Sequence, residues 1–199
     1  MRYSRAALYL FAGLLCACAA REVLVPKSGA APAGVDLSGT WRLRKDASAG
    51  ERRIDEAIRR TDGVNDSVIL RPPEQQNERN RVGAGSSRNP GGLVHVFLES
   101  GTNLKITQTG AGLFLSFDRA VVVEYRFGEN REVTLGPVVA DRVSGWEGRV
   151  YVAETLDQDS MKLTERFALV DHHTLRRTIV FRSKSDEEET IVQTFDRIG

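Results

Sequence analysis

The sequence predicts a mainly β protein, an antiparallel up-and-down β-barrel with one short helix inserted after the first strand. From Leu93 onward, apolar and polar residues alternate with a period of two, which is typical of strands that bury one face. Turn residues recur about every 8–14 residues in this part of the chain, with no helical pattern between them. We expect so many consecutive strands to close into a barrel, because closure removes the unpaired edges of the sheet.

The composition excludes several other classes of protein. The 199 residues are 41% hydrophobic and 28% charged, which is ordinary for a globular domain and excludes both a polytopic membrane protein and a wholly disordered chain. The 28 basic and 27 acidic residues give a net charge of +1, so we expect no nucleic-acid partner. Only two cysteines, Cys16 and Cys18, are present, which excludes a disulfide-rich scaffold.

The N-terminus has the pattern of a secretion signal over residues 1–17. Arg2 and Arg5 form a basic region in front of the apolar run 6–15. This run is too short to cross a bilayer, which needs roughly 20 apolar residues. We therefore expect an exported protein whose first residues are removed.

Leu15, Ala17 and Cys18 resemble the lipobox of bacterial lipoproteins, standing at its aliphatic, small and lipidated places. The resemblance implies that Cys18 is the lipid attachment site and that the chain is anchored to a membrane of the cell envelope. Ala19 after the cysteine implies, by the same resemblance, an outer-membrane lipoprotein facing the periplasm. The alternative is ordinary signal cleavage at the small residues around Cys18, which would release a soluble periplasmic or secreted protein.

Residues 18–35 are expected to form a flexible tether, since they are rich in small residues and interrupted by prolines. The barrel domain is expected to span residues 36–199. Its first strand follows Gly39, which marks the turn into the strand formers Thr40 and Trp41.

The inserted helix is predicted over residues 49–61. Ser48 and Glu51 form a capping box at its start, in which each side chain bonds to a free backbone amide of the first turn. The apolar stripe at helical spacing consists of Ile54, Ala57 and Ile58. Residues 72–92 are too polar and too rich in Gly, Pro and Asn to bury anything, so we expect a disordered loop there.

The remaining strands follow from the alternation and from the turns between them. Strands are expected at 104–108, 113–117, 121–127, 131–135, 138–143, 149–156, 161–170, 174–182 and 189–197.

Gly39, Thr40 and Trp41 resemble the Gly-x-Trp motif of lipocalins and related calycin barrels. The resemblance implies a lipocalin-like barrel in which Trp41 plugs one end and an arginine of the last strand stacks over it. Arg197 is the candidate, since a guanidinium on an indole ring is a favourable pair. The helix after the first strand departs from the lipocalin pattern. This layout is similar to that of uncharacterised bacterial envelope proteins that combine a Ser-Gly-Thr-Trp start with a lipocalin-like meander.

Two charged residues fall on the apolar face of a predicted hairpin. A three-residue loop at 170–172 would pair Leu163 with Ile179, and it would place Glu165 directly opposite Arg177. Both charges would then line the barrel interior.

Glu154 is expected to add a further carboxylate to this interior, on the same face as Val150, Val152 and Leu156. Two interpretations remain open. The charged residues could form an internal ion pair of small net stability. Alternatively, they could orient the polar head of a small molecule within an otherwise apolar cavity.

The sequence therefore favours a non-enzymatic, lipid-anchored binding module for an apolar or amphiphilic small molecule. The alternative is an envelope interaction protein whose barrel is filled by its own side chains, and a third candidate is a hydrolase or isomerase. We expect no catalytic residue, metal site or cofactor. His172 and His173 are neighbours in a turn, and only His95 remains as a third histidine. A cavity lined by Glu165 and Arg177 would distinguish the first two candidates.

Overall fold

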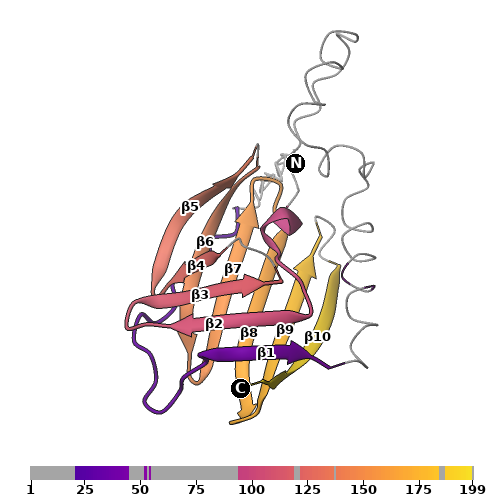
Figure 1. The fold of residues 1–199 in the computed structure, drawn as a ribbon. Helices are drawn as coiled ribbons and strands as arrows, with labels where there is room; N and C mark the ends of the chain where they lie inside the picture. The colour runs from indigo at the N-terminus through magenta and orange to yellow at the C-terminus, as the bar shows by residue number, and fades with distance from the viewer. Residues whose placement is uncertain are drawn as a thin grey trace, which may run out of the picture.

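The computed structural model describes residues 21–44, 52, 54, 94–118, 122–136, 138–183 and 187–198. Ten β-strands and one short 3-10 helix, η4, are found in this part of the chain (Figure 1). The elements are β1 (Gly39–Leu43), η4 (Val94–Phe97), β2 (Asn103–Gln108), β3 (Gly112–Phe117), β4 (Val123–Arg126), β5 (Glu129–Leu135), β6 (Val138–Glu147), β7 (Val150–Asp157), β8 (Lys162–Asp171), β9 (Thr174–Arg182) and β10 (Glu188–Arg197).

All ten strands belong to one sheet, in the order β4-β3-β2-β1-β10-β9-β8-β7-β6-β5. The first and last strands pair antiparallel, with Trp41 opposite Arg197, and this pairing makes the sheet curl round on itself. In Figure 1, β1 to β3 cross in front of β7 to β9. The result is the antiparallel up-and-down barrel predicted from the sequence, closed everywhere except between the edge strands β4 and β5.

The barrel interior is packed with apolar side chains in two clusters. One surrounds Trp41 and includes Phe167 and Phe195. The other includes Phe97, from η4, and Phe181. Alternation along the strands explains this filling, because the inward-facing residues of β8, β9 and β10 are the buried, odd-numbered ones.

The register between β8 and β9 differs from the prediction. Glu165 does not lie directly opposite Arg177; Phe167 faces Arg177, and Glu165 faces Ile179. The cause is twofold: the turn consists of residues 172–173, with Asp171 paired to Thr174, and a bulge in β8 between Leu169 and Asp171 then shifts the register by one residue. Because the net shift from the predicted pairing is by two residues, both charged side chains stay on the inner face and are diagonal neighbours.

Residues 21–28, hereafter the N-terminal strap, lie on the outer face of the barrel. Leu24 is buried there against β6 and β7, and the backbones of Ser28 and Trp146 exchange two hydrogen bonds of 3.3 and 2.9 Å. The expectation of a flexible tether over residues 18–35 is therefore wrong for the strap. Leu24 and the charged side chains of this segment, Arg21, Glu22 and Lys27, find partners on the barrel.

The strap also explains why the prediction that Glu154 lies on the inner face of β7 is wrong. Glu154 lies on the outer face, because the residues of β7 that point into the core are Tyr151 and Ala153. Val152 and Leu156 share the outer face with Glu154 and are nevertheless fully buried. With both faces covered, the strand carries no polar face by which the sequence could tell inside from outside.

Several expectations fall on residues outside the described ranges. These are the signal at 1–17, the lipid site Cys18, the loop 72–92 and the helix 49–61, apart from Arg52 and Ile54. Those two residues have helical backbone, and Ile54 is buried in the second core cluster. In the described part of the chain, no helix is long and apolar enough to cross a membrane.

Candidate functional site

Polar side chains from six strands meet inside the barrel, and we call them the interior polar cluster. Its members are Tyr125 (β4), Arg142 (β6), Thr155 (β7), Glu165 (β8), Arg177 (β9) and Gln193 (β10). Each stands in an alternating series whose other members are apolar core residues, which is why the strands carry it inward. All six are less than a tenth exposed.

Glu165 and Arg177 form an ion pair at the centre of this cluster. The Arg177 Nε donates to Glu165 Oε1 at 3.0 Å, and its Nη2 contacts the same oxygen. Arg177 also donates to Gln193 Oε1 (3.1 Å) and to the Glu99 backbone carbonyl (2.7 Å), and its guanidinium lies over the ring of Phe117. The charge of Arg177 is thus neutralised within the protein.

Tyr125 completes the partners of Glu165. Its hydroxyl donates to Glu165 Oε2 at 2.7 Å. Burial, and next the negative charge of Glu165, raise the pKa of Tyr125 well above its ordinary value. The phenol therefore stays protonated and acts as a permanent hydrogen-bond donor to the carboxylate.

Arg142 is the second buried guanidinium, and its surroundings differ from those of Arg177. It is 6% exposed, its Nε donates to Thr155 Oγ1 at 3.1 Å, and it lies 5.2 and 5.1 Å from the ring centres of Phe97 and Tyr125. Among the described residues, no carboxylate forms an ion pair with it, and its two terminal nitrogens make no hydrogen bond. The six residues of the cluster therefore include two guanidinium groups and one carboxylate. Glu129 of β5, 8% exposed, is a further buried carboxylate, and it pairs with Arg131 at 3.1 Å.

The Gln193 side chain supplies a further free donor. Its Oε1 accepts from Arg177, but its Nε2 is buried and makes no hydrogen bond with the part of the chain that the structure describes. A buried donor without a partner is rare in folded proteins and invites an acceptor from a ligand or water. The interior thus offers positive charge and donors, a combination that suits an anionic or oxygen-rich group.

Arg142 is a site residue that the sequence pattern alone did not indicate. A signal was present, because Val138, Ala140, Arg142 and Trp146 share one side of the alternation in β6. Arginine is usually exposed, so a lone Arg in a strand is ordinarily assigned to the solvent face. Glu165 and Arg177 were placed inside correctly, and Glu154 was not.

Trp41 and Arg197 lie together at one end of the barrel. The Arg197 guanidinium is 4.1 Å from the ring centre of Trp41 and donates to the backbone carbonyls of Ser38 (2.6 Å) and His172 (2.8 Å). An added Cβ on Gly39 would meet this guanidinium, so glycine is required beside it. This contact is the one that the Gly-x-Trp resemblance implied.

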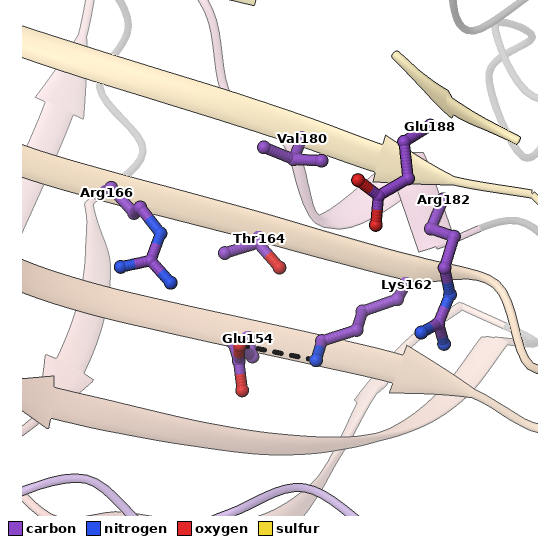
Figure 2. A pocket seen from close by; sticks show the side chains of 7 residues that line it. All are labelled: Glu154, Lys162, Thr164, Arg166, Val180, Arg182 and Glu188. Carbon is purple, nitrogen blue, oxygen red and sulfur yellow. Dashed lines mark ion pairs between the residues drawn. The ribbon is translucent and has the colours of Figure 1, made fainter. Parts of the chain in front are cut away.

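A hollow lies on the outer face and has a volume of about 240 Å³. Figure 2 shows its lining of Glu154, Lys162, Thr164, Arg166, Val180, Arg182 and Glu188. Lys162 pairs with Glu154 at 3.3 Å, and Glu22 of the strap pairs with both Lys162 and Arg182. The cations at this hollow are therefore already paired by the protein's own carboxylates.

No family model and no curated protein matches this chain. The chain can be superposed on several solved structures. One is secretory abundant heat soluble protein 4 from Ramazzottius varieornatus, which is 11% identical in sequence. The match has a TM-score of 0.45 and covers 81% of this chain and 94% of that protein's chain. Lipid binding protein 8 from Caenorhabditis elegans is 10% identical with a TM-score of 0.46, covering 83% and 100%. The fluorescent protein UnaG is 16% identical with a TM-score of 0.43, covering 81% and 97%.

Proposed function

We propose that the barrel is a non-enzymatic binding module for an amphiphilic small molecule whose anionic head contacts Arg142. The observation that best supports this proposal concerns the Arg142 side chain, which is 6% exposed and has no carboxylate partner among the described residues. Burying an uncompensated charge costs several kcal/mol, so such a group is stable in the interior only where a counter-charge can reach it. A carboxylate or phosphate head, which a guanidinium binds through two parallel hydrogen bonds, meets this need.

The ligand's apolar part is inferred from what surrounds Arg142. Phe97 and Tyr125 cover its guanidinium, and the adjoining core cluster is wholly apolar. Small-molecule sites commonly combine such apolar walls with a few polar groups that orient the ligand. Glu165 and Arg177 would shape this site as a self-satisfied ion pair, and Arg142 would contact the ligand.

The proposal includes membrane attachment through a lipid on Cys18, in an outer-membrane lipoprotein facing the periplasm. Its support is the lipobox-like sequence Leu15-Cys16-Ala17-Cys18 and the secretion signal in front of it. A protein held at the envelope would be well placed to take up amphiphiles from a membrane. The alternative of a soluble periplasmic or secreted barrel keeps the same binding site.

The binding proposal is tested with two probes that share a chain and differ in the head, dodecanoate and dodecanol. Charge-assisted hydrogen bonds contribute about 1.5–3 kcal/mol, so the protein should bind dodecanoate roughly 10- to 100-fold more tightly than dodecanol by isothermal titration. Arg142→Met should remove this preference and fold at least as stably, because it removes an unpaired buried charge. Arg126→Met, at an arginine on the outside of β4 that is paired with Glu124, is the matched control and should keep the preference.

Equal affinity for the two probes in the unaltered protein would contradict a role for Arg142. Failure to bind either probe would favour the second candidate, an envelope interaction protein with a filled barrel. A specific observation keeps that candidate in view, since Trp41, Tyr151 and Phe167 are fully buried and already occupy much of the interior.

A further inference from the structure

The N-terminal strap is fixed to the barrel along its length. Leu24 is 5% exposed, and the Ser28 backbone is bonded to that of Trp146. The ion pairs of the strap are Arg21–Asp141 (3.1 Å), Glu22–Lys162 (3.0 Å), Glu22–Arg182, Lys27–Glu147 (2.6 Å) and Lys27–Glu154 (3.2 Å). The first residue of the strap therefore has a defined place on the barrel.

That place is one end of the strands, which we call the strap end. Arg21 contacts Asp141 near the start of β6, while Lys162 begins β8 and Arg182 ends β9. Figure 2 shows Lys162 and Arg182 side by side near the ends of their strands. Leu135, the last residue of β5, lies at the same end, because it pairs with the first residue of β6.

The strap leaves very little chain between the barrel and Cys18. Cys18 precedes Arg21 by three residues, and an extended chain spans at most about 3.6 Å per residue, or about 11 Å in all. A free tether over residues 18–35 would instead reach roughly 20–25 Å and allow the barrel to turn in any direction. A lipid on Cys18 would thus hold the strap end close to the headgroups.

Apolar side chains project from the protein at this end and along the strap that leads away from it. Val23 and Val25 alternate with the docked residues of the strap and are 83% and 68% exposed, and Leu135 is 48% exposed. These are three of the six large hydrophobic side chains exposed in the described part of the chain. Exposed apolar residues beside a lipid anchor are suited to the interface of a bilayer.

We infer that the strap end is a membrane-contact surface, with Val23 and Leu135 in the headgroup region and the barrel held in one orientation. This inference rests on the proposed lipid attachment at Cys18. It adds that the docked strap, and not a flexible tether, determines which end of the barrel faces the lipid.

The test uses the full-length chain, lipidated in a bacterial host and reconstituted in phosphatidylcholine–phosphatidylglycerol vesicles that contain a lipid with a spin label near its headgroup. A thiol-reactive fluorophore is placed at Val23→Cys or at Val170→Cys. Val170 is 53% exposed near the far end of β8, about 26 Å from Lys162 at roughly 3.3 Å per residue. The spin label should quench the fluorophore at position 23 several-fold more strongly than at position 170.

Two variants show whether the strap sets this difference. Glu22→Lys replaces two ion pairs with repulsion from Lys162 and Arg182, so the quenching at positions 23 and 170 should become similar. Glu124→Lys makes the same charge change on β4, away from the strap, and should leave the difference intact.

The mass of the mature protein separates the two ways in which the inference can fail. An acyl mass on Cys18 together with equal quenching at the two positions would overturn the fixed orientation alone. Absence of the acyl mass would overturn the proposed anchor and the orientation with it, while leaving the binding site at Arg142 untouched.

Discussion

Two buried arginines in one interior show how the partner of a charge decides its role. Arg177 is 0% exposed and meets a carboxylate, an amide oxygen, a backbone carbonyl and an aromatic ring. Arg142 meets a hydroxyl and two rings. A satisfied buried ion pair contributes little net stability, but it costs much when one partner is removed. The first arginine is therefore satisfied by the protein itself, and the second is the one that the proposed ligand would contact.

The Glu165–Arg177 pair gives a prediction at the scale of single residues. Glu165→Ala should destabilise the protein by about 3–5 kcal/mol, because it leaves the fully buried Arg177 without its counter-charge. Glu165→Ala combined with Arg177→Met should be more stable than Glu165→Ala alone, since the uncompensated charge is then absent. Urea unfolding followed by tryptophan fluorescence measures both. If the single and double variants lost equal stability, the pairing would not be the source of the cost.

At the scale of elements, the positions of the strands along the chain were predictable, but which face of each strand points into the barrel was less so. Period-two alternation placed β2, β3 and β7 to β10 within about two residues of their observed ends. It failed for the faces of β7, where Val152 and Leu156 are buried on the outside under the strap. It also failed for the register between β8 and β9. The turn there lies at 172–173, and a bulge in β8 depends on backbone geometry that no residue type near Val170 indicates.

The docking of the strap gives a prediction at this scale. An added Cβ on Gly145 would clash with the Ser28 carbonyl and lie 2.9 Å from Lys27 Cβ, so Gly145→Ala should push the strap off the barrel. Trypsin should then cleave after Lys27 several-fold faster, while the far-ultraviolet circular dichroism of the barrel stays unchanged. Gly110→Ala is the control, because an added Cβ there meets nothing within 4 Å. Equal cleavage of the two variants would show that the close approach at Gly145 does not hold the strap.

For the whole molecule, the sequence predicted a barrel, which is closed except between β4 and β5, but it did not predict that the inner and outer faces would each carry a separate set of charged contacts. Closure follows from the number of alternating strands and from the Trp41–Arg197 contact. The strap was not foreseen, since a segment containing Pro26 and small residues resembles a linker until its partners on β6 and β8 are known. Arg142 was missed for the same reason, because its meaning depends on what surrounds it in space.

Because the barrel wall separates the contacts of Glu22 from those of Arg142, we predict that the inner and outer sites act independently. Glu22 has its partners on the outer face, at Lys162 and Arg182, while Arg142 contacts Thr155 and aromatic rings inside. Because the sites share no partner, the unfolding free energies of Glu22→Lys and Arg142→Met should add within about 0.5 kcal/mol in the double variant. Glu22→Lys alone should also leave the preference for dodecanoate over dodecanol unchanged. A larger interaction energy, or a loss of that preference in Glu22→Lys, would mean that the strap and the interior are coupled through the barrel wall.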